Sequence, residues 1–565
     1  MSRAEQYDAI VVGSGISGGW AAKELTERGL KVLLLEAGRP TDPAKDYVEH
    51  VQPWEMKYRG WGDRAMLEKN QPTQKLCYAC DEWSGKFFVN DLENPYTTPE
   101  NKPFHWIRGR QVGGRSITWG RQVYRWSDLD FEANARDGHG VDWPIRYADI
   151  APWYDHVERF IGVSGNKEGM AAVPDGQFLP PMALRCAEQH VRDRLLKAYN
   201  GERVVTIGRV AILTADHNGR QACHYCGPCE RGCITRSYFS SPSSTLPAAQ
   251  ATGRLTLRPF SVVESVLYDA KARKATGVRV IDANTMKTIE YKARIVFLCA
   301  SALESTRLLL NSAHTEYPGG LGSSSGALGK YLMDHTMGNG ASGTIPGYEK
   351  HRSYGNRPNG IYLIRYANVK EQNPAFLRGY AYQGGGWRSG WGRGSSMEGF
   401  GADFKQSLLT EQGPWQFSLD GRGEMLPRAE NFVELDPAVK DKWGIPALRI
   451  TCEYGENEKA QWKHQIASAV EMLEAAGARD IKTFTSDNWV KPGLVIHEMG
   501  TARMGRDPKT SVLNGTNQVW DAPNVFVTDG ACMTSSAFQN PSITYMALTA
   551  RAADHAVALM KRKEL

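Results

Sequence analysis

Two residues near the C-terminal end of the chain, His497 and Asn540, carry side chains that together could oxidise an alcohol. His497 opens a His-Glu-Met-Gly-Thr segment, and Asn540 opens an Asn-Pro-Ser segment. A neutral imidazole can accept a proton from a hydroxyl group, because its ordinary pKa lies near neutral pH. An amide can donate a hydrogen bond to the oxygen as negative charge develops there. A lone histidine is more often structural, but this pair is predicted to be catalytic if another part of the chain binds a redox cofactor.

The start of the chain has the pattern of a nucleotide-binding unit. An apolar run over 7–12 precedes a glycine-rich turn, an amphipathic stretch, a second apolar run over 31–35 and Glu36. The turn contains four candidate cofactor residues: Gly13, Gly15, Ser17 and Gly18. Such glycines permit a tight turn and close approach of the backbone to a pyrophosphate, and the acid can accept hydrogen bonds from a ribose. The pattern predicts a dinucleotide, either FAD or NAD; the alternative is a glycine-rich turn in another βαβ unit.

Size and composition narrow the class of protein. The 565 residues can form two or more domains, and 41% hydrophobic and 23% charged residues are ordinary for a soluble enzyme. The net charge of +6 is small, and no basic stripe indicates nucleic-acid binding. No apolar run is long enough to predict a membrane span. The first predicted strand begins at Tyr7 and leaves no room for a signal peptide. We therefore expect a cytoplasmic protein, or a periplasmic one if a signal-bearing partner exports it.

Four cysteines are spaced as C-x2-C-x2-C-x3-C: Cys223, Cys226, Cys229 and Cys233. This spacing matches the bacterial ferredoxin run, and the glycine and proline between the thiols permit tight turns. A [3Fe-4S] cluster would use three of these thiolates and a [4Fe-4S] cluster all four. The alternatives are a zinc site with Cys77 and Cys80 as a second pair, a disulfide pair, or free thiols in a structural loop.

The remaining pattern predicts an α/β protein with two domains. Alternating strands and a helix between 255 and 312, and a strand and closing helix after 525, indicate a nucleotide-binding domain interrupted by other segments. Residues 340–450 are rich in aromatic residues and glycine, and they predict an antiparallel sheet with long loops. We expect a discontinuous Rossmann-like domain over 1–330 and 491–565, with a Cys-rich loop at 220–236 and an irregular insertion at 45–105, and a substrate-binding domain over 331–490.

With these segments assembled, the chain resembles the glucose–methanol–choline (GMC) flavoprotein oxidoreductases over nearly its whole length. The resemblance rests on the glycine turn with Glu36, the segment from Arg108 to Ser116, the 328–335 segment that ends in Asp334-His335, His497-Glu-Met-Gly-Thr, Asp529-Gly530 and Asn540-Pro541. It implies FAD as the cofactor, a nucleotide domain woven from separate segments, and a substrate domain resting on a β-sheet.

The resemblance also implies further contacts with FAD. The expected residues are Arg108, Gly113, Gly114, Ser116, Thr118, Trp119, Gly120, Val262, Asp529, Gly530 and Pro541. Backbone at 118–120 would face the flavin N5, Val262 the adenine side, and Asp529 the ribityl chain or pyrophosphate. Some pyranose oxidases carry a flavin-linked histidine where this chain has Thr118, so FAD is expected to bind non-covalently.

Within the family, the 112–119 segment and the His497–Asn540 pair are most similar to pyranose oxidases and bacterial glycoside 3-dehydrogenases. The implied reaction is oxidation of a secondary alcohol of a sugar or glycoside, at C3 of a pyranose, with His497 as the base. Hydride would pass to flavin N5, and electrons would leave to an acceptor other than oxygen. The implied partners are a small subunit and a cytochrome c-type acceptor. The alternatives are an oxygen-using oxidase, an electron-transfer flavoprotein subunit, and a non-redox GMC lyase.

Overall fold

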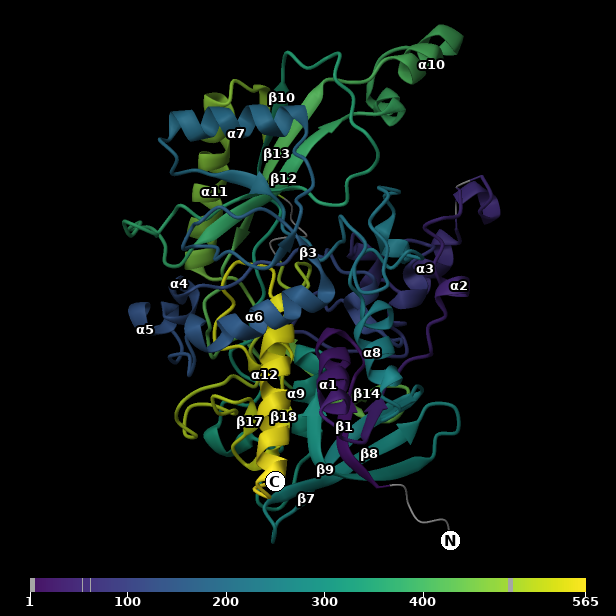
Figure 1. The fold of residues 1–565 in the computed structure, drawn as a ribbon, viewed down its shortest axis with the longest axis vertical. Coiled ribbons are helices and arrows are strands. Elements are labelled where there is room, and N and C mark those ends of the chain that lie inside the picture. The colour runs from purple at the N-terminus through teal and green to yellow at the C-terminus, as the bar shows by residue number, and fades with distance from the viewer. Residues whose placement is uncertain (1–5, 53, 61, 486–490) are drawn as a thin grey trace.

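Two β-sheets organise the computed structural model, which describes residues 6–52, 54–60, 62–485 and 491–565 (Figure 1). The first sheet has the strand order β17-β18-β9-β1-β2-β6, and β7 and β8 extend it beyond β9. Strands β1 (Tyr7–Val12) and β2 (Val32–Leu35) are buried along nearly their whole length, as expected of parallel strands covered on both faces. β1 also pairs in parallel with β9 (Thr288–Leu298), which pairs with β18 (Ala522–Val527). Both ends of the chain therefore contribute to one sheet.

Two helices from opposite ends of the chain lie side by side next to this sheet. α1 (Ile16–Glu27) packs against α12 (Ser542–Lys561), as Figure 1 shows. Their buried residues share one apolar cluster with the sheet and include small side chains that permit close packing: Ala21, Ala22, Ala552, Ala553 and Ala556. Residues at the starts of both helices line one cavity.

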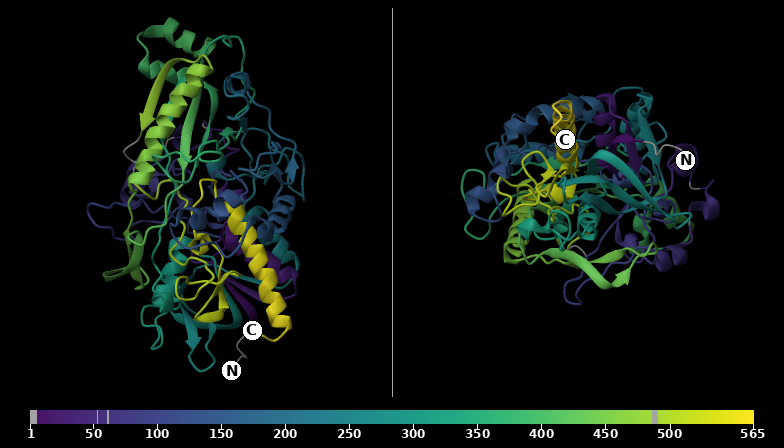
Figure 2. Two further views of the ribbon diagram at one scale, coloured as in Figure 1. Left: turned by 90° about the vertical axis from the view of Figure 1, so that its left-hand side faces the viewer. Right: turned by 90° about the horizontal axis from the view of Figure 1, so that it is seen from below.

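The second sheet is antiparallel, with the order β16-β10-β13-β12-β11-β5. Its strands are β16 (Arg479–Thr485), β10 (Asn339–Ile345), β13 (Trp415–Gly423), β12 (Tyr380–Arg388), β11 (Ile361–Leu363) and β5 (Val205–Ile207). Helix α11 (Glu456–Ala475) packs on this sheet and buries Ala469, Met472 and Leu473 against it (Figure 2). Every second residue of β13 is buried, so its two faces have different environments.

Shorter elements connect and flank the sheets. The other strands are β3 (Val163–Ser164), β4 (Phe178–Leu179), β6 (Leu255–Arg258), β7 (Ser261–Asp269), β8 (Lys274–Asp282), β14 (Phe432–Lys440), β15 (Pro446–Thr451) and β17 (Gln518–Val519). The other α-helices are α2 (Pro43–Asp46), α3 (Arg64–Asn70), α4 (Asp128–Phe131), α5 (Ala133–Asp137), α6 (Tyr147–Ile161), α7 (Cys186–Ala198), α8 (Thr245–Ala251), α9 (Ala302–Asn311) and α10 (Gly401–Thr410).

The predicted α/β class with a parallel and an antiparallel part is confirmed. The domain boundaries stay a prediction. One strand does not follow them, because β5 precedes residue 330 yet forms an edge of the second sheet. Within the described part of the chain, no helix is both long and apolar enough to cross a membrane.

Candidate active site

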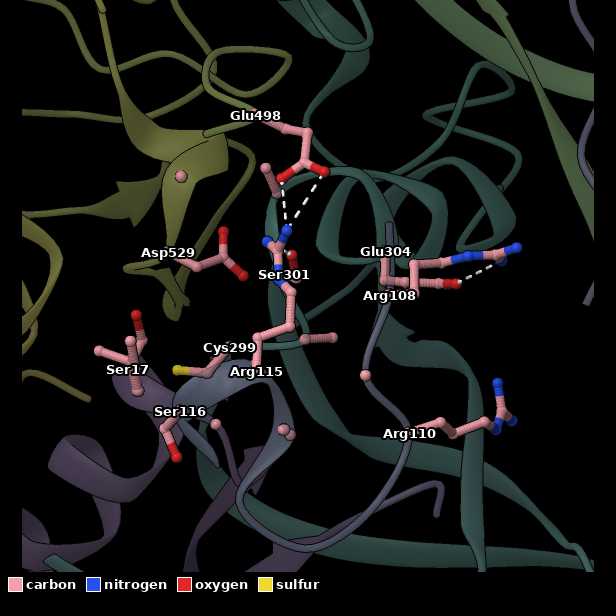
Figure 3. Close-up of a pocket in the computed structure, with 18 of the residues that line it drawn as sticks. Ser17, Arg108, Arg110, Arg115, Ser116, Cys299, Ser301, Glu304, Glu498 and Asp529 are labelled. Carbon is pink, nitrogen blue, oxygen red and sulfur yellow. Dashed lines mark hydrogen bonds and ion pairs between the residues drawn. The ribbon is translucent and has the colours of Figure 1, made fainter. Parts of the chain in front are cut away.

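A cavity of about 270 Å³ lies at the carboxyl ends of the parallel strands. Most of the predicted cofactor residues line it: Gly13, Gly15, Ser17, Glu36, Arg108, Gly114, Ser116, Thr118, Trp119, Gly120, Val262, Asp529, Gly530 and Pro541. His497 and Asn540 line the same cavity. Figure 3 shows part of this lining, with Ser17, Ser116 and Asp529 around a common space. The fold thus brings the predicted cofactor and catalytic residues together.

Two predicted cofactor residues, Gly18 and Gly113, do not line the cavity and instead shape its wall. A β-carbon on Gly18 would overlap the carbonyl oxygen of Gly13, so only glycine lets α1 pack this closely on the turn. Gly113 has a φ of +99°, and a β-carbon there would lie 2.6 Å from the ring of Pro242. Both positions require glycine for close packing rather than for contact with a ligand.

The glycine turn fits the phosphate and ribose of a dinucleotide. A β-carbon on Gly15 would meet no protein atom within 4 Å, so the backbone of the turn faces open cavity at the N-terminus of α1. Glu36 lies beside it and accepts hydrogen bonds from the Ser14 hydroxyl at 2.6 Å and the Gly38 N–H at 2.9 Å. Burial raises the pKa of Glu36. The turn and the acid therefore offer the two contacts that the sequence predicts.

The sequence did not predict the ion pair between Arg115 and Glu498 inside the cavity. The Arg115 guanidinium donates to the Glu498 carboxylate at 2.9 Å and to the Ser301 hydroxyl at 2.8 Å (Figure 3). Glu498 is almost fully buried, so its charge depends on this partner. The only sequence signal was position: Arg115 lies within the 108–116 segment, and Glu498 follows His497.

Other charged side chains complete the cavity wall. The Arg108 guanidinium lies 4.1 Å from the centre of the Trp106 ring and donates to the Asn94 carbonyl oxygen. Its Nε atom is buried without a partner among the described residues. Asp529 accepts from the Ser305 hydroxyl at 2.5 Å, and burial raises the pKa of Asp529 to about 6. Arg108 and Asp529 can each therefore bind a polar group of a cofactor.

His497 and Asn540 face each other across the catalytic end of the cavity. Asn540 Nδ2 lies 3.5 Å from His497 Nε2. Burial, reinforced by His335, Arg422 and Arg115, lowers the pKa of His497 well below its ordinary value, so the imidazole is neutral near pH 7. Because 3.5 Å is long for a hydrogen bond, both groups remain available to a hydroxyl between them.

His335 decides which nitrogen of His497 carries the proton. His335 Nε2 lies 2.9 Å from the Ser536 carbonyl oxygen, which can only accept, so this nitrogen bears hydrogen. Burial lowers the pKa of His335 to about 4, so its Nδ1 is an acceptor. That Nδ1 lies 3.0 Å from His497 Nδ1, which must therefore donate. His497 is left with its lone pair on Nε2, facing the cavity and Asn540.

Gln383 fixes the orientation of Asn540 in the same way. Gln383 Nε2 donates to Asn540 Oδ1 at 2.6 Å, which turns the Asn540 NH₂ group toward His497. Gln383 lies on β12, so this hydrogen bond joins the second sheet to the catalytic pair. Nothing in the sequence indicates this role of Gln383, because a glutamine in a glycine-rich strand carries no recognisable signal.

Asp334 holds the backbone on which the two histidines sit. One carboxylate oxygen accepts from the His335 N–H at 2.8 Å and the His497 N–H at 3.2 Å, and the other accepts from the Gly493 N–H at 2.7 Å. Burial, with the nearby charge of Glu498, raises the pKa of Asp334 to about 7. This side chain explains why the 328–335 segment belongs to the site.

The four clustered cysteines line a second, much smaller cavity. Cys223, Cys226, Cys229 and Cys233 surround a space of about 10 Å³ beside Tyr238 and Asn356. All four are free thiols, and the described residues contain no group of three or more His, Cys, Asp or Glu side chains arranged to hold a metal ion. Cys77 and Cys80 are buried in a separate apolar cluster and do not line this space. The zinc arrangement with two pairs is therefore not formed.

Comparison with known proteins matches the chain over most of its length. The GMC oxidoreductase N-terminal pattern matches residues 7–337, and the C-terminal pattern matches residues 427–549. A 2-methyl-1,2-propanediol dehydrogenase from Mycolicibacterium austroafricanum is 31% identical over 98% of this chain and 95% of its own. The fructose dehydrogenase large subunit of Gluconobacter japonicus is 24% identical over 97% of both chains.

Solved structures with the same fold are more distant in sequence. A formate oxidase variant from Aspergillus oryzae superposes with a TM-score of 0.61 at 14% identity and covers all of both chains. A pyridoxine 4-oxidase from Mesorbium loti gives a TM-score of 0.57 at 17% identity, with 97% of this chain and 98% of that chain covered. These similarities support the two-sheet fold of this chain.

The fit of the glycine turn to a nucleotide cofactor can be tested with Gly15→Val. The added side chain finds no protein atom nearby and would project into the cavity. We expect the visible absorbance of bound flavin to fall at least about tenfold, because the backbone could no longer approach a pyrophosphate. The thermal unfolding temperature of the cofactor-free protein should stay unchanged. The matched control is Gly390→Val, since Gly390 also has open space around it but lies outside the cavity. Full flavin content in Gly15→Val would refute the assignment.

Proposed function

The chain belongs to the GMC oxidoreductase family, and from this premise we propose that it oxidises a secondary alcohol of a sugar or glycoside with non-covalently bound FAD. The proposed position is C3 of a pyranose, which gives a 3-keto sugar. The family is FAD-dependent and acts on alcohol- or sugar-type substrates. The observation that carries the proposal is the position of His497 Nε2, 3.5 Å from the Asn540 amide at the cavity wall, with His497 Nδ1 3.0 Å from His335.

The cavity residues fit FAD from one end to the other. The glycine turn and Glu36 would hold the pyrophosphate and ribose, Val262 would contact the adenine side, and residues 118–120 would face the isoalloxazine ring. When bound, FAD would accept the hydride that leaves the substrate carbon. Thr118 offers no imidazole for a covalent link to the flavin.

The protein must remove the second hydrogen as a proton. His497 takes the hydroxyl proton on Nε2, and the O–H bond electrons form the C=O bond as hydride leaves the carbon. The positive charge that develops on His497 is shared through its Nδ1–H with His335 Nδ1 at 3.0 Å. The Asn540 NH₂ group donates to the substrate oxygen and, held by Gln383, keeps the reacting C–H in a fixed orientation.

The electrons leave, in this proposal, to an acceptor other than oxygen. The dehydrogenases among the relatives support this reading: the diol dehydrogenase, the fructose dehydrogenase large subunit and a gluconate 2-dehydrogenase flavoprotein from Pantoea cypripedii. A small subunit and a cytochrome c-type acceptor are the proposed partners. The proposed compartment is the cytoplasm, or the periplasm if a signal-bearing partner exports the chain. An oxidase is the second candidate, because a paromamine 6'-oxidase from Streptomyces fradiae is 26% identical.

An iron–sulfur cluster at the four cysteines stays a prediction from their spacing. The four thiols line one small cavity but are not arranged to hold a metal ion, so the spacing alone carries this prediction, and no step of the proposed reaction passes through a cluster. Iron and acid-labile sulfide analysis of anaerobically purified protein tests it directly.

The proposed function is tested by adding methyl glucopyranoside and related glycosides to the purified enzyme without oxygen. Loss of the oxidised flavin absorbance and formation of a 3-keto product are the expected results, because hydride transfer reduces the flavin. Turnover with oxygen is then compared with turnover with a ferricenium or quinone dye. Faster turnover with the dye supports the dehydrogenase, whereas no reduction by any pyranose would contradict the proposal. An electron-transfer subunit would show no reduction by alcohols at all.

His497→Ala removes the proposed base. We expect FAD to stay bound and kcat to fall by about 10²- to 10⁴-fold, the range that general-base catalysis contributes. Steady-state kinetics and flavin absorbance measure the two effects separately. Asn540→Ala should show a smaller fall in kcat. Near-normal turnover of His497→Ala with the best substrate would sink the assignment of the base.

The lowered pKa of His497 predicts the pH dependence of the reaction. A base whose pKa is lowered stays unprotonated as the pH falls, so kcat/KM should hold its plateau below pH 6.5 and decline only at more acidic pH.

His335→Leu removes the acceptor for the Nδ1–H of His497, so the imidazole is free to take the wrong tautomer. We expect this change to lower kcat by about 100-fold.

His335→Asn is the matched control for this effect, because its side-chain oxygen can still accept the hydrogen bond from His497 Nδ1. It should keep more activity than His335→Leu at equal flavin content. An acid limb of kcat/KM centred at or above pH 6.5 in the unmodified enzyme would contradict the neutral, buried His497.

A further inference from the structure

Arg121 lies at the catalytic end of the cavity, directly after the segment expected to face the flavin. Its side chain lines the cavity together with Gln122, His497 and Asn540. The backbone of Arg121 has a φ of +62°, a left-handed conformation that is unfavourable for a residue with a side chain. Its carbonyl oxygen accepts a hydrogen bond from the Ala211 N–H at 2.9 Å, which holds the position.

The Arg121 guanidinium has no ionic or hydrogen-bonding partner in the described part of the chain. Only 8% of the residue is exposed, and its Nε is buried without an acceptor. Its nearest favourable contact is the Tyr238 ring, with the ring centre 5.2 Å away. By contrast, Arg115 in the same cavity pairs with Glu498 at 2.9 Å. Because a buried unpaired charge is costly, Arg121 lacks an anion that the protein itself does not supply.

The surroundings of Arg121 add positive charge and donors at the same end. A β-carbon on Gly120 would lie 3.4 Å from the Tyr78 hydroxyl, so this hydroxyl lies close to the residue that precedes Arg121. Arg422 on β13 pairs with Asp420 at 3.0 Å, yet its Nη1 is buried without a partner. Burial raises the pKa of Tyr78, and the Arg121 and Arg422 guanidinium groups oppose this increase, so both lie within electrostatic reach of it.

Sheet register places Arg422 on the side of the catalytic pair. Arg422 is opposite Ala381 in the β12–β13 ladder, and Asp420 is opposite Gln383. Directly opposed residues share a face of the sheet, as do residues two apart on one strand. Arg422 therefore shares a face with Gln383, whose side chain reaches Asn540.

The groups behind Arg121 do not neutralise it. Burial lowers the pKa of Arg121, but Cys229, Tyr78, Tyr238 and Glu230 in their ionised forms outweigh this effect and raise it. Burial raises the pKa of Cys229, so its thiol is neutral. The Glu230 carboxylate lies 3.9 Å from Arg231, which competes for it. Arg121 therefore lines the cavity, while the Tyr238 ring and the four-cysteine loop on its other side supply no ion-pair partner.

We propose that the substrate of this enzyme is an acidic sugar or glycoside whose carboxylate binds Arg121 while the hydroxyl to be oxidised lies between His497 and Asn540. This inference rests on the proposed function, because it places a second group of the same substrate. A guanidinium can bind a carboxylate through two parallel hydrogen bonds, and such a contact fixes orientation as well as affinity. The Tyr78 hydroxyl is a second donor for the same group. A phosphate ester would offer the same anionic chemistry from another source.

The test measures binding to the FAD-loaded enzyme after its flavin has been reduced with dithionite, so no substrate is oxidised during the titration. Methyl glucopyranosiduronate and methyl glucopyranoside, which differ in one carboxylate, are titrated anaerobically by calorimetry; glucose 6-phosphate is the phosphate arm. We expect the unmodified enzyme to bind the carboxylate ligand at least about tenfold more tightly than the neutral one. Arg121→Gln should bring this ratio close to one, whereas Arg121→Lys keeps part of the preference because it keeps the charge.

Arg279→Gln, which removes a surface arginine outside the cavity, is the control and should keep the ratio. Equal binding of acidic and neutral ligands by the unmodified enzyme would overturn the inference. So would an unchanged ratio in Arg121→Gln, which would assign the residue to the cofactor instead. Tighter binding of glucose 6-phosphate than of the uronate would overturn the proposed carboxylate and indicate a phosphate ester as the group that binds Arg121. Preference for the acid without oxidation of any glycoside would preserve this inference and contradict the proposed function.

Discussion

The parallel pairing of four strands, β1, β2, β9 and β18, is the constraint on which the site depends. Val12 lies opposite Leu35 and Leu298, and Leu298 lies opposite Val527. The residues that follow these strands therefore meet at one edge of the sheet. Gly13, Glu36, Cys299 and Asp529 reach the cavity for this reason alone. A shift of one residue in any of these pairs would move each side chain to the opposite buried face and disrupt its packing there, so packing on both faces sets the register.

The catalytic pair depends on a second connection, which links the two sheets. A run of polar contacts passes from the Ser536 carbonyl through His335 and His497 to Asn540 and ends at Gln383 on β12. Each contact limits the donors and acceptors of the next, so one backbone carbonyl determines which nitrogen of His497 can accept a proton. Burial of the two histidines lowers the pKa of both and keeps this arrangement neutral. The geometry and the proton positions are thus parts of one network.

Buried charges in this protein are mostly compensated, and the exceptions are informative. Arg378 pairs with Glu424 at 2.8 Å, and Arg307 pairs with Asp441 at the same distance. Those pairs join segments and leave no charge for a ligand. Arg121 differs because it is buried and lines the cavity, yet it has no carboxylate partner in the described part of the chain. A buried arginine that is paired with a carboxylate of the protein has a structural role. A buried arginine without such a partner at a cavity wall indicates that an anionic ligand binds there.

Much of the fold and of the site followed from local patterns. The glycine turn with Glu36, the buried strands and the closing helix are encoded in short segments, because hydrophobic periodicity and glycine positions act over a few residues. Local order also led to His497 and Asn540, and the structure places them on one cavity wall. The spacing of the four cysteines likewise drew attention to one loop, but spacing does not specify where each sulfur points. The described residues hold no metal-binding arrangement there.

What the sequence determined by itself was therefore the class of fold, the nucleotide turn and the identity of the residues able to move a proton. Only the tertiary structure decided how those residues are oriented and charged. His335, Gln383 and Arg115 reach the site from segments far from His497 in the sequence, so no local pattern connects them to it. The same holds for Arg121, whose significance is the lack of a partner. Burial, hydrogen-bond direction and charge compensation are properties of the packed chain, and they exist only after distant segments meet.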